Sequence, residues 1–238
     1  MSGAAARTGS CSLSARALAV VALAALAVCS AVPAEAAGPR VRAMVVGRSG
    51  KVVAGVKSVR LDAFRYRRCR IGSALPLGVL HFLRLPYRAR GGCESLYVFQ
   101  VGGSRAFGRQ GWVYKVGTRS GTAAASDPTG PFGRGRIRSG AEVVWFWCRR
   151  ALRCQRSLKV TGERRVRRGG RIRFRVRGYD DYGRSRVVRG ATVAVGRARA
   201  RTDRRGLVTI RFVRRGLFRL RASKRGLVPA FPIGIRVT

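Results

Sequence analysis

The clearest pattern in the chain is a strict alternation of arginine with apolar residues over residues 171–177. Because side chains of a strand point alternately to opposite faces, this alternation predicts a strand with one buried and one solvated face. The same period of two recurs in four later segments, which are separated by turn-forming residues. The residues predicted to point inward are Ile172, Phe174 and Val176; Val193 and Val195; Val208, Ile210 and Phe212; Phe218, Leu220 and Ala222; and Ile233, Ile235 and Val237. About seven short strands at this spacing predict an antiparallel, immunoglobulin-like β-sandwich over residues 155–238.

The preceding part of the chain, residues 38–154, has shorter and less regular apolar runs. Five of these runs are rich in β-branched and aromatic residues, which favour strands. These predicted strands are at residues 41–46, 52–61, 96–101, 112–116 and 142–148. A short helix is expected at 74–83, where Pro76 suits the first turn. Residues 117–140 are rich in Gly, Ser, Thr and Pro and predict a long surface loop, and such loops are either functional or disordered.

Three segments of this part carry a resemblance to a known family. Residues 97–103 (YVFQVGG), 111–117 (GWVYKVG) and 137–147 (IRSGAEVVWFW) resemble the transcobalamin-like C-terminal domain family. That family has a strand ending in NG, a W-x-Y-x-V-N-G strand and a GD-x-V-x-W strand; here glycines replace both asparagines and alanine replaces the aspartate. The resemblance covers roughly residues 41–150 and implies a β-grasp-like α+β domain, in which a helix crosses a small mixed sheet. It also implies a small-ligand role, since the corresponding domain of transcobalamin helps to cover cobalamin.

The second part of the chain carries another resemblance. Residues 188–195 (VRGATVAV), 202–210 (TDRRGLVTI) and 216–222 (GLFRLRA) resemble bacterial immunoglobulin-like or carboxypeptidase-regulatory-like modules of surface proteins. Such modules usually act as spacers or adhesive units. The predicted fold class is therefore mainly β, with a β-grasp-like α+β domain at 38–154 followed by an immunoglobulin-like antiparallel β-sandwich at 155–238.

The N-terminus predicts a targeting segment. Positive charge at Arg7 and Arg16 precedes an apolar run at 17–28, and small residues follow at 34–37, as in a cleavable signal peptide over residues 1–36. The run of 12 residues is shorter than the roughly 20 that a membrane-spanning helix needs, and no span is expected in the mature chain. An alternative is a lipoprotein signal with its anchor on Cys29. We expect a secreted or cell-surface protein.

The four cysteines after this segment are Cys69, Cys93, Cys148 and Cys154. An even number of cysteines in an exported chain predicts disulfide bonds, here two. Three pairings are possible, and we favour Cys69–Cys93 with Cys148–Cys154 because each pair then lies within one local segment. A four-cysteine zinc site is the alternative, although structural zinc ligands usually come in closer pairs.

The formal charge of +42 arises from 51 Lys and Arg against 9 Asp and Glu. One interpretation is compositional, because Arg replaces Lys as the ordinary surface cation in proteins of high-GC genomes. In either case, such a charge attracts polyanions with strong salt dependence. The expected partners are anionic cell-wall polymers or other polyanions, rather than a specific nucleic acid.

Catalytic chemistry has few residues to draw on. His81 is the only histidine, so any Ser-His-Asp or Cys-His arrangement would depend on it. Asp180 and Asp181 are adjacent, which suits a turn better than the opposed carboxylates of a glycosidase. No phosphate-binding glycine motif is present and no cofactor is expected. A hydrolase remains an alternative hypothesis, and a structural role for His81 is favoured.

An aromatic cluster is the remaining candidate site. If strands 112–116 and 142–148 are neighbours, Trp112 and Tyr114 face Trp145 and Trp147 and form a stacking platform for a flat ligand. The favoured interpretation is that these rings fill the core. Burial of both Trp112 and Trp145 would count against the platform and against a cobalamin-like small-ligand binder. The leading functional hypothesis is an exported, non-catalytic binding or cell-surface protein that engages an anionic polymer or a small ligand.

Overall fold

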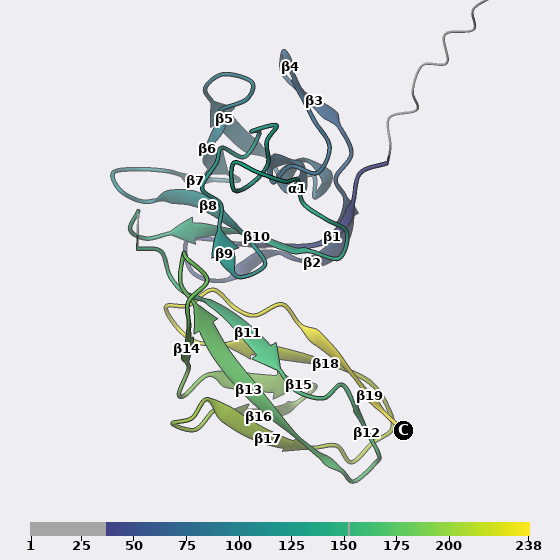
Figure 1. Cartoon of the computed structure of the whole chain (residues 1–238). Coiled ribbons are helices and arrows are strands. Elements are labelled where there is room, and N and C mark those ends of the chain that lie inside the picture. Colours follow the sequence, from purple (N-terminus) through teal and green to yellow (C-terminus); the bar gives the residue numbers. More distant parts are fainter. Residues whose placement is uncertain (1–36, 152) are drawn as a thin grey trace, which may run out of the picture. The chain divides into compact units, whose positions relative to one another are not determined.

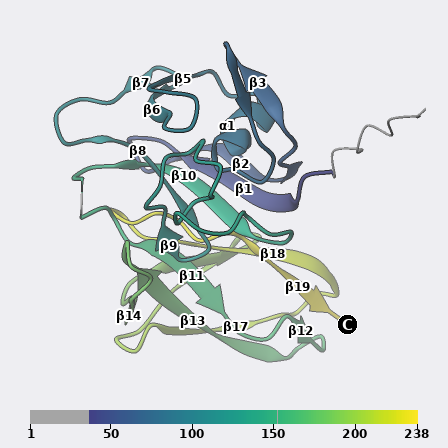
Figure 2. The same ribbon diagram turned by 45° about the horizontal axis from the view of Figure 1, so that its top comes forward.

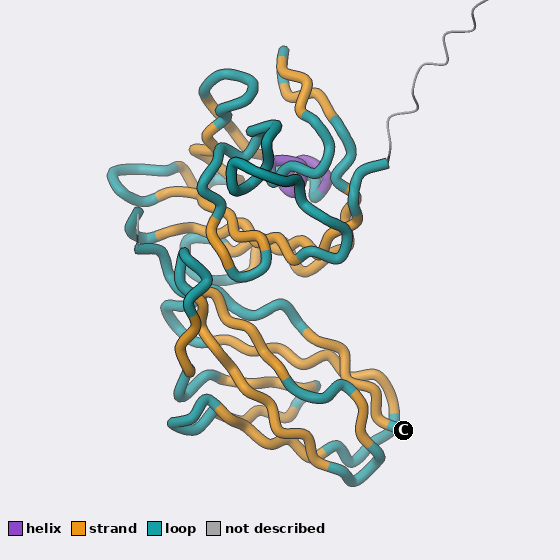
Figure 3. The backbone as a smooth tube through the Cα atoms, viewed as in Figure 1, coloured by secondary structure: helices purple, strands orange, loops and turns teal. Residues whose placement is uncertain are grey.

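The computed structural model describes residues 37–151 and 153–238, and in them the chain is mainly β (Figure 1). The predicted signal peptide at 1–36 and the alternative anchor at Cys29 lie outside the described residues. Strands and loops make up nearly all of the described chain, together with the helix α1 (Leu77–Phe82) (Figure 3). The strands of the first part are β1 (Arg40–Val46), β2 (Val52–Arg60), β3 (Phe64–Tyr66), β4 (Cys69–Ile71), β5 (Tyr87–Arg90), β6 (Tyr97–Val101), β7 (Ser104–Arg105), β8 (Gly111–Val116), β9 (Arg119–Ser120) and β10 (Glu142–Cys148). The strands of the second part are β11 (Ser157–Thr161), β12 (Arg165–Val166), β13 (Arg171–Tyr179), β14 (Ser185–Val187), β15 (Thr192–Val195), β16 (Ala198–Arg201), β17 (Leu207–Arg211), β18 (Gly216–Ser223) and β19 (Ile233–Val237).

A mixed sheet with strand order β2-β1-β10-β8-β9 organises the first part. Strands β1 and β10 are parallel, and the other neighbours are antiparallel. Strand β10 is buried along almost its whole length, so both faces of the sheet centre are covered. One face carries Val143, Trp145 and Trp147 into the main core of this part. The other face carries Val144 and Phe146 into a separate cluster, which Val228 and Phe231 of the second part join; this cluster is completed by Met44, Val46 and Cys148.

Helix α1 packs on the first face of this sheet. Leu77, Val79 and Leu80 are buried in the same core as Trp145, and the Trp145 Nε1–H donates to the Pro76 carbonyl at 2.9 Å. The helix is shorter than the 74–83 segment predicted, and Pro76 lies at its N-cap, one residue before the first turn in which it was expected. A hairpin of β3 and β4 and a three-stranded sheet β5-β6-β7 complete the part.

Two sheets form the second part, and their inner faces share one hydrophobic core. Strand β13 pairs with β11 on one side and with β14 and β17 on the other. The second sheet has the order β12-β19-β18-β15-β16. Figure 2 shows β11, β13 and β17 running side by side, as their pairing requires. Phe174 and Val176 of β13 meet Leu220 and Ile235 in this core, as the alternation predicts.

The described residues from 37 onward belong to one compact unit. Its two main hydrophobic clusters fall on either side of residues 148–157, and the third cluster draws residues from both sides. The layout of a β-grasp-like domain followed by an immunoglobulin-like sandwich stays a prediction. Within the described residues, no helix has the length and apolarity needed to cross a membrane.

Candidate functional site

Strand pairing brings the four predicted aromatic residues together. Trp112 lies opposite Trp147 in the β8–β10 pair, with ring centroids 5.7 Å apart, and Tyr114 lies opposite Trp145 at 5.3 Å. The predicted neighbourhood of the two strands is therefore confirmed. However, the rings are only 3%, 6%, 2% and 2% exposed for Trp112, Tyr114, Trp145 and Trp147. All four residues lie in the core, so the favoured interpretation is confirmed and the alternative of an exposed stacking platform is contradicted.

The segment predicted as a surface loop, residues 117–140, covers the Tyr114 side chain. The Tyr114 hydroxyl donates to the carbonyls of Ala123 and Pro131, at 2.7 and 3.2 Å, and burial raises the pKa of this phenol. Ala125 and Ile137 enter the core. A side chain at Gly121 would lie 2.0 Å from the Tyr114 ring, so the backbone approaches this ring directly. The segment is therefore buried in part and packs against the tyrosine, which corrects the prediction of a surface loop.

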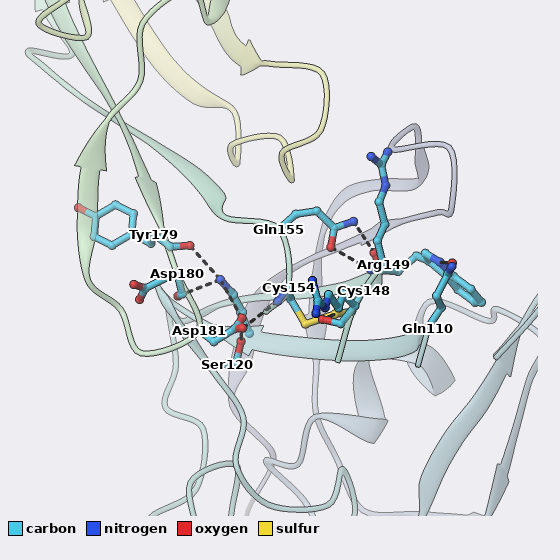
Figure 4. The surroundings of a disulfide bond; sticks show 12 residues. Gln110, Ser120, Cys148, Arg149, Cys154, Gln155, Tyr179, Asp180 and Asp181 are labelled. Atoms are coloured by element: carbon cyan, nitrogen blue, oxygen red, sulfur yellow. Dashed lines mark hydrogen bonds and ion pairs between the residues drawn. A yellow bond between two sulfur atoms is a disulfide. The ribbon is translucent and has the colours of Figure 1, made fainter. Parts of the chain in front are cut away.

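Both predicted disulfide bonds are present, with the favoured pairing of Cys69 with Cys93 and Cys148 with Cys154. The thiolates that the zinc alternative needs are therefore oxidised. Figure 4 shows Gln155 beside the second disulfide, where its amide donates to the Trp147 carbonyl at 2.9 Å and accepts from the Arg149 backbone N–H at 3.1 Å. These bonds hold the chain as it leaves β10.

A buried lysine beside this disulfide was not anticipated from the sequence. Lys115 of β8 is fully buried, and its Nζ donates to the carbonyls of Tyr179 at 2.9 Å and Asp180 at 3.0 Å. Its ion-pair partner is Asp181, whose Oδ1 is 3.7 Å away. The Asp181 carboxylate also accepts from the Ser120 hydroxyl at 2.7 Å and from the backbone N–H of Cys154 at 3.0 Å (Figure 4). Residues from both parts of the chain thus share one polar network.

Desolvation governs the charge of this lysine. Burial lowers the pKa of Lys115 to about 8, and the nearby Asp181 carboxylate opposes that shift. A lysine of this kind is a possible base or nucleophile in an enzyme. Here, however, two backbone carbonyl oxygens hold Nζ, and the whole side chain is buried. We therefore assign Lys115 to linking the two parts of the chain.

The remaining candidates for catalysis lie apart from one another. His81 stacks on Phe64 with ring centroids 4.0 Å apart, and burial lowers the pKa of its imidazole. Asp180 caps its own turn, where its Oδ1 accepts from the backbone N–H groups of Tyr182 at 3.1 Å and Arg184 at 2.9 Å. Within residues 37–151 and 153–238, no group of His, Cys, Asp or Glu is arranged to hold a metal ion.

The outer face of β13 carries a regular row of arginines. Arg171, Arg173 and Arg175 are exposed, while Ile172 and Phe174 between them are buried. Neighbouring strands add to this face by pairing, with Arg211 of β17 opposite Arg171 and Lys159 of β11 opposite Arg177. Strands β11, β13 and β17 contain no Asp or Glu. We call the outward residues of these three strands the basic face; its basic members are Lys159, Arg171, Arg173, Arg175, Arg177 and Arg211.

Comparison of the chain with protein-family models, with curated proteins and with solved structures found no match.

Proposed function

We propose that this chain is an exported, non-catalytic protein that binds anionic polymers at the cell surface. The observation that carries the proposal is the basic face, where arginines at alternate positions of β13 are exposed over a strand whose other side is buried. Such an array has two possible origins, surface composition or polymer binding. A guanidinium presents several donors that match phosphate or carboxylate oxygens, so the array is a suitable surface for a polyanion in either case.

Two further observations support the proposal. The two disulfide bonds suit an oxidising compartment. The excess of basic over acidic residues, 51 against 9, draws anionic polymers from a distance and makes their binding dependent on salt. The burial of the aromatic rings counts against the small-ligand hypothesis, which depended on their being accessible.

The test is a binding titration of the disulfide-bonded protein with inorganic polyphosphate and with poly-L-glutamate, at several salt concentrations. We expect binding to both polymers at about 50 mM salt, with an association constant that falls steeply and linearly on logarithmic axes as salt rises. A neutral dextran is the matched control polymer and should not bind. No binding to either polyanion at low salt, or binding that salt does not weaken, would overturn the proposed function.

A further inference from the structure

A pocket of about 460 Å³ adjoins the basic face at the edge of β17. Arg173 of β13 and its pairing partner Thr209 of β17 line it from the sheet, and Arg201, at the end of β16, lines it from the other sheet. Arg205, in the turn between β16 and β17, completes the set of cations. Three arginines and a threonine therefore line one hollow, and one of these arginines, Arg173, also belongs to the row along β13.

The turn that carries Arg205 is fixed by its own hydrogen bonds. The Asp203 Oδ1 accepts from the backbone N–H groups of Arg205 and Leu207, each at 2.8 Å, and these bonds hold the pKa of the carboxyl below its usual value. Thr202 is buried, and its hydroxyl donates to the Val188 carbonyl at 2.6 Å. Gly206 has a positive φ of 72°, and a side chain there would meet the Val176 carbonyl at 2.8 Å. These hydrogen bonds fix the conformation of the turn that forms one wall of the pocket.

The arginines of the pocket are only partly balanced by nearby acidic charge, through the electrostatic attraction between Arg205 and Asp203. Over residues 37–151 and 153–238, the guanidinium groups of Arg173, Arg201 and Arg205 have no hydrogen-bond or ion-pair partner. Asp203 is the one acidic residue of the lining, and its Oδ1 is engaged by the backbone of the turn. Three cations against one carboxylate leave an excess of positive charge, which suits an anionic group of a ligand.

On the basis of the proposed function, we propose that this pocket binds a phosphate group of a linear polyol-phosphate polymer, whose neighbouring phosphates lie along Arg171 and Arg175. One guanidinium fork satisfies a planar carboxylate, whereas a tetrahedral phosphate accepts bonds from several arginines converging from different directions. Alternate residues of a strand are about 7 Å apart, so the row suits a flexible chain with regularly spaced anions. The exposed positions of residues 171–177 carry no aromatic ring on which bases would stack, which disfavours a nucleic acid.

The experiment compares two variants that lose the same charge. The pocket variant is Arg173→Gln/Arg201→Gln/Arg205→Gln. The control variant is Arg219→Gln/Arg221→Gln/Arg236→Gln, whose arginines are exposed on the outer face of β18 and β19. Binding of a defined poly(glycerol phosphate) is measured by calorimetry, with poly-L-glutamate and single-stranded DNA as the other polymers. Thermal unfolding of both variants checks that these surface changes leave the fold intact.

We expect the pocket variant to lose at least tenfold in affinity for poly(glycerol phosphate), and the control variant to lose threefold or less. The wild-type protein should also prefer this polymer to poly-L-glutamate and DNA of equal charge. Equal losses in the two variants would overturn the pocket while leaving general polyanion binding in place. Preference for poly-L-glutamate or for DNA would overturn the assignment of the ligand. Failure of the wild-type protein to bind any of the three polymers would instead overturn the proposed function.

Discussion

The two parts of the chain reach a stable β structure by different means. The second part, from β11 to β19, contains no cysteine or tryptophan, and regular alternation places its apolar side chains between two sheets. The first part, up to β10, holds all three tryptophans, both ends of one disulfide and the long segment 117–140. The central sheet of the first part has a hydrophobic cluster on each face, and large side chains fill these clusters. Regular alternation thus accompanies the part built of two sheets over one core, whereas the part with irregular apolar runs holds the largest buried rings and a disulfide bond.

Removing one buried ring from each main core tests whether the two parts unfold together or independently. Trp145→Ala and Phe174→Ala each remove a fully buried ring, one from each main core, and each should lower the free energy of unfolding by about 3–5 kcal/mol. All three tryptophans lie in the first part, so their fluorescence reports that part, while far-UV circular dichroism reports both. Because the third cluster and Lys115 join the parts, we expect both probes to show one shifted denaturant transition in each variant.

The surface substitution Arg173→Gln is the control and should change the free energy of unfolding by less than about 0.5 kcal/mol. A fluorescence transition that stays at the wild-type position in Phe174→Ala would show that the two parts unfold independently. The two parts would then differ in their stability as well as in how their cores are built.

The two disulfide bonds are expected to stabilise the protein by different amounts, and by less than a buried ring does. Their sequence separations are 24 and 6 residues, so loop entropy predicts losses of about 3.5 kcal/mol for Cys69→Ala/Cys93→Ala and about 2.4 kcal/mol for Cys148→Ala/Cys154→Ala. The measurement is the free energy of unfolding in urea for each double variant, beside the oxidised wild-type protein. A larger loss for the short loop than for the long one would contradict this order. It would indicate that the Cys148–Cys154 bond acts mainly by holding the polar network around Asp181.

Elements with a buried face and a regular period were predictable from the sequence. The bounds of β10 and β19 agree with the predicted segments, and β13 extends only two residues beyond its alternation. Short strands were missed. Strands β3 and β4 have three residues each, which is too few for their alternation of buried and exposed residues to stand out in the sequence. Strand β16 is mostly exposed at a sheet edge, so backbone pairing rather than side-chain pattern defines it.

The surroundings of Lys115 and of the aromatic cluster were less predictable, because they depend on which segments cover each face of the sheet. The period of two places Lys115 on the face opposite Tyr114, and nothing in β8 indicates that this second face is covered as well. A signal was present in β10, where residues 142–148 have no polar alternation, as is typical of a strand buried on both sides. The aromatic cluster was located correctly by strand pairing, but its covering segment 117–140 has no regular pattern that would predict its path.

The smallest expected effect concerns Lys115, which joins the two parts. Its pKa in the folded protein is about 8, below the ordinary value of 10.5, so between these pH values the unfolded chain binds more protons than the folded one. The stability that this residue contributes is therefore expected to rise as pH increases from 8 to 10.5, by an amount on the order of 1–3 kcal/mol. The Lys115→Met variant lacks this titration, and comparing it with the wild-type protein cancels the contributions of Tyr114 and the other groups that ionise in both.

The measurement is the free energy of unfolding of both proteins at pH 7, 8, 9 and 10. At pH 7 the methionine leaves the carbonyls of Tyr179 and Asp180 without their donor but also removes a buried charge, so the two effects offset each other in part. The informative quantity is therefore the change with pH of the difference between the proteins. A difference that stays constant over this range would mean that Lys115 keeps its charge in the folded state. The network around Asp181 would then act as a fully formed ion pair that fixes the two parts together, rather than as a desolvated amine held by carbonyl oxygens.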